Sequence, residues 1–310
     1  MASKHCWVVD ARLDLNQGIH VVAWRDFEVR HGRSMSYEVY KPSLDGQGMH
    51  VICIHDWQAS PGTFHGLVTC LDGLGLRCII PRFDCNHPPN NGPNNVPGNG
   101  TRSCSWHESL LDLLEELHVD RFGIIAFGMF GGSIARHVMQ ALGMHRYTFV
   151  SLLSPGPCLI DTPARDAFWN MLPAETRARI LDLPRDAIAA MASRAVDLFN
   201  LSGSARSRDE LSADLDRLVD ELVALSDTAP PKHGTCTVPV EVICGELDEV
   251  VPLELAFKTV RHFREVHVNV IPLAGHHFLE DFCEEAARCL QEFLVTRVAR
   301  DTWDGIRSTS

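Results

Sequence analysis

The chain has 310 residues, of which 45% are hydrophobic and 22% are charged, a composition typical of globular proteins. Its formal net charge of −12 argues against nucleic acids and anionic membrane surfaces as partners, because both are bound mainly through clustered Lys and Arg. The length fits one large α/β domain with an insertion, or two ordinary domains. We therefore expect a small-molecule ligand or a protein partner. The sequence leaves the oligomeric state open.

The first residues, MASKHCWVVDARLDL, lack the apolar centre of a secretory signal, and no apolar run reaches the roughly 18 residues of a membrane span. We therefore expect a soluble, cytoplasmic protein. The chain has 11 cysteines, and Cys53, Cys78 and Cys244 fall inside predicted strands. A thiol in such a position behaves as a small hydrophobic group, so these three are predicted to be buried and reduced.

Strands and helices alternate along most of the chain. Alternating or continuous apolar runs predict strands at residues 20–29, 34–41, 49–55, 76–81, 147–153, 240–245 and 266–273. Apolar residues at helical spacing predict helices at 61–71, 106–118, 252–263 and 278–299. Residues 122–143 (FGIIAFGMFGGSIARHVMQALG) read as a strand, a sharp glycine-rich turn and a helix. The first two strands, around His31-Gly32-Arg33, form a predicted hairpin.

Two segments interrupt this alternation. Residues 82–104 are rich in Asn, Pro and Gly and predict a long loop, interpreted either as a functional segment or as a disordered surface insertion. From residue 154 to 232 the pattern is helical without strands. We therefore expect an α/β fold with a mostly parallel, eight-stranded sheet, flanked by helices, and a helical cap inserted after the sixth strand. The predicted boundaries are a core of 1–153 and 236–300, a cap of 154–235 and a tail of 301–310.

Four features together resemble the α/β-hydrolase family with a helical cap. They are the strand order, the glycine-rich start of the helix after residue 127, GELDEVVP at 245–252 and LAGHHF at 273–278. The resemblance covers roughly residues 20 to 297. It implies that Asp248 and His276 match the acid and the histidine of a catalytic triad, in which the carboxylate fixes the tautomer of the imidazole. His277 is interpreted as a packing residue, although a register slip would exchange the two histidines.

The resemblance also implies a nucleophile at the sharp turn, the nucleophile elbow of the family, but this sequence has none. Counting from the strand places Gly128 at the elbow, whereas anchoring on Gly131 and Gly132 places Met129 there. Neither side chain attacks carbon. Ser133 lies one turn into the helix and is a poor candidate for a displaced nucleophile. The two registers also place a phenylalanine, Phe130 or Phe127, where the family has a small residue.

His55-Asp56-Trp57 stands where the family has His-Gly and a residue whose backbone N–H helps to bind an oxyanion. By resemblance, the N–H groups of Trp57 and of Met129 or Phe130 take this role. We expect the Asp56 carboxylate to point to solvent or to a nearby Arg, since facing the pocket it would oppose a developing negative charge. Candidate pocket residues in the cap are Phe168, Trp169 and Met171, with Met191 and Phe199; the alternative is that they form the core of the cap.

The leading hypothesis is an enzyme that uses a His276–Asp248 dyad as a general base on a small, largely apolar organic substrate. Lyase, decarboxylase, cyclase, isomerase and cofactor-free oxygenase reactions need a base and no covalent intermediate. One alternative is a pseudoenzyme that binds a ligand or protein without turnover, with the dyad a remnant of the fold. Another is a hydrolase whose nucleophile was removed or displaced. No cofactor is expected, and a metal site built from His55, His87, His276 or His277 lacks the usual ligand spacing.

Overall fold

The structure is a computed structural model. It describes residues 7–8, 23–29, 33–40, 48–56, 59–83, 106–156, 237–253, 256–257, 263 and 265–298. The predicted cap beyond residue 156, most of the predicted loop 82–104 and the tail 301–310 lie outside this part of the chain.

One sheet of nine strands runs through the described residues, in the order β1-β2-β3-β5-β4-β6-β7-β8-β9. The strands are β1 (Trp7–Val8), β2 (Ala23–Val29), β3 (Arg33–Tyr40), β4 (Met49–Ile54), β5 (Leu76–Pro81), β6 (Phe122–Phe127), β7 (Tyr147–Leu153), β8 (Val240–Gly245) and β9 (Val266–Ile271). Those from β5 to β9 in this order pair in parallel. The sheet is therefore mostly parallel, as the sequence predicts.

The hairpin predicted at the start of the sheet is confirmed, because β2 and β3 pair antiparallel with Val29 opposite Arg33. Strand β3 then pairs antiparallel with β5 and joins the hairpin to the parallel strands. The sequence predicts eight strands, and the additional one is β1, which pairs antiparallel with β2. Two residues are too short to show an alternating pattern, so the prediction missed this strand.

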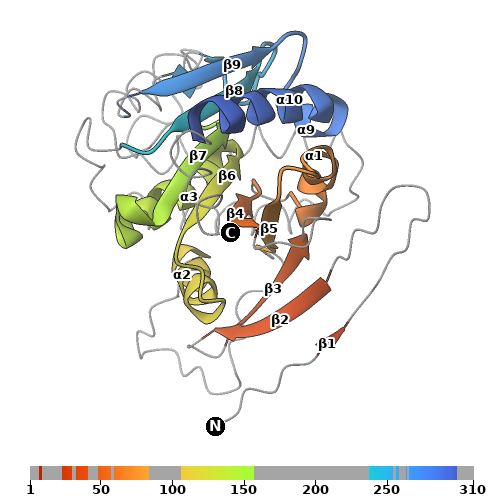
Figure 1. Cartoon of the computed structure of the whole chain (residues 1–310). Coiled ribbons are helices and arrows are strands. Elements are labelled where there is room, and N and C mark those ends of the chain that lie inside the picture. The colour runs from red at the N-terminus through yellow and green to blue at the C-terminus, as the bar shows by residue number, and fades with distance from the viewer. Residues whose placement is uncertain are drawn as a thin grey trace, which may run out of the picture.

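Helices cover both faces of the sheet (Figure 1). On one face lie α2 (Trp106–Glu116) and α3 (Gly128–Leu142), the second of which leads through η2 (Met144–Arg146) into β7. On the other lie η1 (Pro61–Phe64), α1 (His65–Cys70), α9 (Phe278–Asp281), α10 (Cys283–Phe293) and the π-helical turn η3 (Leu294–Val298). The central strands are consequently buried on both faces, which accounts for their continuously apolar sequences.

The C-terminal helix departs from the prediction. A single helix over residues 278–299 is expected, but the helix stops at Phe282, whose backbone angles are φ −128° and ψ 34°. The chain then restarts as α10. Apolar spacing alone does not report such a break, because the residues on both sides of it still face the same core.

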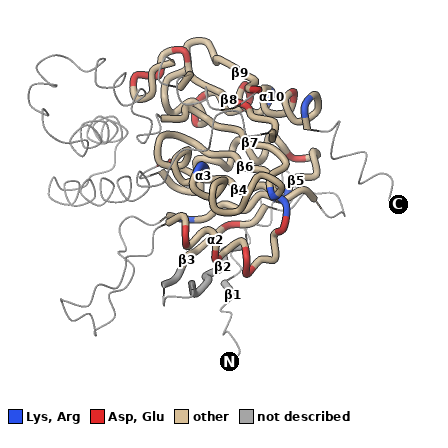
Figure 2. The backbone as a smooth tube through the Cα atoms, turned by 90° about the vertical axis from the view of Figure 1, so that its left-hand side faces the viewer, with Lys and Arg blue, Asp and Glu red and all other residues tan. Residues whose placement is uncertain are grey.

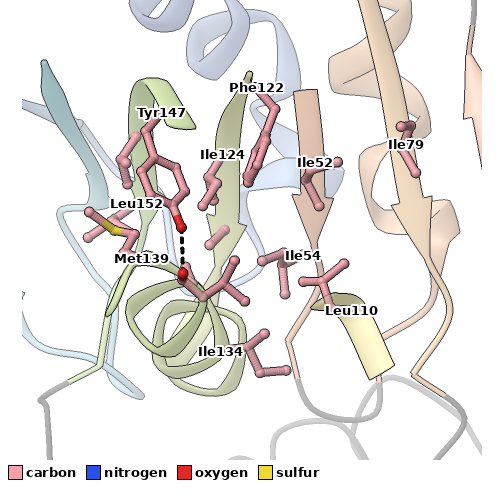
Figure 3. Packing of buried hydrophobic residues seen from close by; sticks show 14 of the residues in the cluster. Ile52, Ile54, Ile79, Leu110, Phe122, Ile124, Ile134, Met139, Tyr147 and Leu152 are labelled. Carbon is pink, nitrogen blue, oxygen red and sulfur yellow. Dashed lines mark hydrogen bonds between the residues drawn. The ribbon is translucent and has the colours of Figure 1, made fainter. Parts of the chain in front are cut away.

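The larger core lies between the sheet and α2 and α3. Figure 3 shows Ile124 and Ile54, on neighbouring strands, on the side of the sheet that carries Ile134 and Leu110. The hydroxyl of Tyr147 donates a hydrogen bond to the carbonyl oxygen of Val138 in α3 (Figure 3). Helix α3 is thereby fixed on the sheet, and with it the turn that precedes the helix.

Cys53, Cys78 and Cys244 are buried and free, as predicted. Acidic residues are distributed over several separate segments of the described chain, among them α2 and α10 (Figure 2). Within the described residues, no helix combines the length and apolarity that a membrane span requires.

Candidate active site

Four loops at the carboxyl ends of parallel strands bring the predicted site residues together. Asp56 follows β4, Gly128 follows β6, Asp248 follows β8 and His276 follows β9. Because parallel strands end at the same edge of a sheet, residues far apart in sequence meet at this edge. Asp56, Asp248 and His276 are each at most 5% exposed. Three titratable groups are therefore enclosed in one site.

Asp248 and His276 are in direct contact. The Nδ1 of His276 lies 2.9 Å from Oδ2 of Asp248. The other oxygen, Oδ1, accepts hydrogen bonds from the backbone N–H groups of Val250 at 2.9 Å and Val251 at 2.7 Å. The carboxylate is thus held by the turn after β8 and in turn orients the imidazole. It is His276, and not His277, that contacts Asp248.

A glycine at the end of β8 allows this contact. A Cβ atom on Gly245 would lie 2.4 Å from the carbonyl oxygen of Ala274 and 2.5 Å from that of Gly275. Both distances are closer than any side chain tolerates, so only glycine lets the loop that carries His276 approach the end of β8 this closely. The glycine that opens GELDEVVP therefore has a steric role in joining the two motifs.

Gly128 is the first residue of α3 and directly follows β6. Its φ of +74° lies in the left-handed region, while Phe127 before it is still extended. Glycine adopts this conformation without the penalty that a Cβ atom imposes. Met129, the alternative candidate, is the second residue of α3, has no positive φ, and is buried with its side chain near Gly156. Residue 128 is therefore the position whose backbone conformation requires glycine.

Asp56 points into the site, so the expectation that it faces solvent or an Arg is wrong. Its Oδ1 accepts a hydrogen bond from the N–H of Phe130 at 2.9 Å, and its Oδ2 lies 3.4 Å from Nε2 of His276. A Cβ atom on Gly128 would lie only 2.0 Å from Oδ2 of Asp56. The carboxylate therefore fills the space that a side chain at residue 128 would need. An N–H group near the start of α3 compensates part of its charge.

His276 is held between two carboxylates. Burial alone would lower its pKa, but the hydrogen bonds and charges of Asp248 and Asp56 outweigh burial and raise the pKa to about 9. The ring of Phe127 stacks on the imidazole with centroids 5.3 Å apart, an arrangement that favours a cation. The raised pKa favours the imidazolium form of His276 at neutral pH, and the two ring nitrogens both face carboxylate oxygens.

His55 has a structural role beside the site. Its Nε2 accepts a hydrogen bond from the N–H of Phe83 at 3.2 Å, so its Nδ1 carries the proton and donates to the carbonyl oxygen of Asp56 at 2.8 Å. Burial lowers the pKa of His55 to about 4. The neutral ring ties the end of β4 to Phe83, two residues after β5, and fixes the backbone of Asp56.

The remaining candidates are not part of this cluster. The hydroxyl of Ser133 donates to the carbonyl oxygen of Met129 at 2.9 Å, a bond within α3. The ring of His277 contacts that of His276 edge to face, and the pKa of His277 is lowered by burial and by the charge of its neighbour. In the part of the chain that the structure describes, no group of three or more His, Cys, Asp or Glu residues is arranged to hold a metal ion. Trp57, His87, Phe168, Trp169 and Met171 lie outside the described residues.

The contact between Asp56 and His276 was missed by the sequence reasoning. A signal for it exists in the sequence. An acidic residue stands where the resembled family has glycine, and a glycine stands where that family has its nucleophile. Each departure taken alone looks like loss of function, but together they indicate that one side chain has taken the space of another.

No protein-family model and no curated protein matches the sequence. Solved structures with the same architecture are numerous. Cfl2 from Burkholderia cenocepacia is 18% identical with a TM-score of 0.63, over 94% of this chain and 99% of Cfl2. One of the novel epoxide hydrolases from metagenomes of hot environments is 16% identical with a TM-score of 0.56, over 87% of this chain and 98% of that hydrolase.

A thermophilic esterase from Thermogutta terrifontis is 15% identical with a TM-score of 0.55, over 87% of this chain and 97% of the esterase. Together with the sheet order and the flanking helices, these likenesses show that the chain has the α/β-hydrolase fold.

Proposed function

We propose that this protein is an enzyme in which His276, oriented by Asp248, performs acid–base chemistry on a small, largely apolar organic substrate without a nucleophile at residue 128. The single observation that carries the proposal is the position of His276, in contact with both Asp248 and Asp56 beside the strained turn at Gly128. Lyase, decarboxylase, isomerase, cyclase and cofactor-free oxygenase reactions are compatible with such a site, since each needs a positioned proton donor or acceptor.

Hydrolysis through an acyl-enzyme at the turn is disfavoured. Glycine has no side chain to acylate, and loss of a triad nucleophile lowers the rate by a factor of about 10⁶. The space beside Gly128 is also filled by Asp56. A carboxylate in this place repels the oxyanion that forms when an ester carbonyl is attacked. The arrangement therefore supports proton transfer and not acyl transfer.

An apolar substrate is suggested by the group beside the imidazole. Phe127 is buried and its ring stacks on that of His276. Exclusion of water strengthens the interaction of His276 with the two carboxylates and with any polar group of a substrate.

The test uses a His276→Gln variant and a panel of small aryl ketones, β-keto acids and aryl esters. We expect turnover of the accepted compound to fall by about 100-fold or more, while the thermal shift caused by that compound persists. His145→Gln is the matched control, since His145 is an exposed histidine in η2 away from the site. Undiminished turnover by His276→Gln would contradict the proposal.

A second candidate function is ligand binding without turnover. This function is favoured by the Asp56 carboxylate, which occupies the place of a nucleophile beside Gly128. A site without a nucleophile can bind a ligand and leave it chemically unchanged. In that case a ligand that stabilises the protein is recovered chemically unchanged after long incubation. Chromatography of the recovered ligand separates the two functions.

A further inference from the structure

We infer that Asp56 is the catalytic base of this site and His276 its partner acid, and that the substrates are small ketones or aldehydes with a removable C–H next to the carbonyl. This inference rests on the proposed function, because it assigns the two roles within the same site. The inference goes beyond the proposed function by giving the proton-accepting role to Asp56, in the loop that follows β4, and by naming the substrate class.

The geometry of Asp56 separates its two oxygens. Oδ1 is held by the N–H of Phe130 at 2.9 Å, whereas Oδ2 faces Nε2 of His276 at 3.4 Å. The second distance is longer than the roughly 2.7–2.9 Å of a good charge-assisted hydrogen bond. A carbonyl oxygen can therefore replace Oδ2 as the acceptor of the Nε2 proton and leave Oδ2 free to take a proton.

Asp248 is less available than Asp56 as an acceptor of a substrate proton. Its Oδ1 accepts from two backbone N–H groups, and its Oδ2 accepts from Nδ1 of His276. His276 is not available as an acceptor either, since both of its nitrogens face carboxylates. The titratable groups that face the His276 ring are Asp248, Asp56 and His277, and the pKa of His277 is lowered. Of this group, Asp56 is the one with an oxygen held only by a long contact, which a substrate would displace.

The distance between Nε2 of His276 and Oδ2 of Asp56 suits the carbonyl oxygen and the α carbon of one ketone. The carbonyl oxygen and the neighbouring carbon of a ketone are about 2.4 Å apart, given standard C=O and C–C bond lengths. Atoms this close can contact Nε2 of His276 and Oδ2 of Asp56 at the same time, since these two are 3.4 Å apart. Asp56 therefore places its carboxylate beside Gly128, where a base would contact the α carbon.

The proton transfers balance without a further reactant. Oδ2 of Asp56 takes the proton from the α carbon as the C–H bond breaks, and the electron pair forms the C=C bond. The carbonyl oxygen takes the proton of Nε2 of His276, which gives an enol and a neutral imidazole. In the reverse direction Nε2 recovers its proton from the enol oxygen, and Asp56 returns a proton to carbon. The result is exchange, isomerisation or racemisation at the α carbon.

The experiment follows exchange of α protons for deuterium by NMR, with phenylacetone and cyclohexanone in D₂O and benzaldehyde, which has no α C–H, as the compound control. We expect the wild-type protein to accelerate exchange of the ketones, and Asp56→Asn to reduce the rate by at least about 100-fold. Asparagine keeps an oxygen for the N–H of Phe130, so the variant preserves the hydrogen bond to α3. The wild-type rate should fall as the pH rises above about 9, where His276 loses its proton.

A merely structural role of Asp56 gives a different result. If Asp56 only keeps His276 protonated, Asp56→Asn regains the wild-type rate at a pH low enough for NMR to show that its own imidazole is protonated. Such recovery, or a rate that rises through pH 9, overturns the inference. Absence of exchange by the wild type with both ketones also overturns it, but leaves the proposed function standing if another compound is turned over with dependence on His276.

Discussion

The carboxylate of Asp56 lies where a side chain on Gly128 would have to be. A Cβ atom on Gly128 would be 2.0 Å from Oδ2 and 2.1 Å from Cγ of Asp56. The two residues come from different strand ends, β4 and β6, and are complementary in volume. Substitutions at the two positions should therefore be strongly non-additive.

Gly128→Ser alone should be destabilised and should not hydrolyse esters. The φ of +74° costs a residue with a Cβ atom about 1–2 kcal/mol, and the clash with Asp56 adds to this. In the double variant Gly128→Ser, Asp56→Gly the space is free, and the serine hydroxyl stands beside His276. We expect measurable hydrolysis of p-nitrophenyl acetate by the double variant, with Asp56→Gly as the control. Equal rates for these two proteins would contradict this reading of the turn.

Asp248→Asn should weaken the chemistry more than the fold. Asparagine retains an oxygen for the N–H groups of Val250 and Val251, but its amide nitrogen cannot accept the Nδ1 proton of His276. We expect a loss of about 10²–10⁴ in rate, in line with the loss of the orienting carboxylate in a triad. The variant should stay folded and lose only the part of the stability that Asp248 supplies by raising the pKa of His276. A loss of both activity and folded structure would instead assign Asp248 to the fold.

His276 makes the stability of the protein depend on pH. Its pKa in the folded protein is raised to about 9, whereas an unperturbed histidine titrates near pH 6.5. The stabilisation is therefore fully present below about pH 6.5 and is lost as the pH rises to about 9. The difference in unfolding free energy between wild type and His276→Gln should shrink over this window by up to about 3 kcal/mol. Urea unfolding at pH 6, 7.5 and 9 measures it.

Glu241 should destabilise the fold at alkaline pH. It is fully buried on β8, where burial raises its pKa to about 7 although Ser151 and Asn269 donate hydrogen bonds to it. Folding therefore favours the protonated acid, and stability falls as the pH rises from about 4.5 through 7. Glu241→Gln, which mimics the protonated acid, should raise the unfolding free energy at pH 8 by about 1–3 kcal/mol. The same stability at pH 4.5 and pH 8 in the wild type would contradict this.

The fold could be predicted from the sequence because apolar residues recur at strand spacing in the strands and at helical spacing in the helices. The strand–turn–helix unit around Gly128 and the motifs that carry Asp248 and His276 are local patterns, and the structure brings these residues to one edge of the sheet. The break at Phe282 was not accessible, because it changes the backbone angles without changing which residues face the core.

The direction of the Asp56 side chain is signalled in the sequence only when residues 56 and 128 are considered together. Acidic side chains at loop positions most often reach water, and that general preference produced the wrong expectation. The orientation depends on three partners that are distant in sequence, namely the N–H of Phe130, Nε2 of His276 and the empty space at Gly128. Only the packed fold places these three together.

The most direct measurement of the central claim is the ¹⁵N NMR spectrum of His276 at pH 7.5, assigned by comparison with His276→Gln. An imidazole between Asp248 and Asp56 that works as a proton donor should show both nitrogens protonated, and Asp56→Asn should lower its pKa. A neutral ring at pH 7.5, with one nitrogen unprotonated and no response to Asp56→Asn, would contradict the claim that the three residues form one acid–base unit.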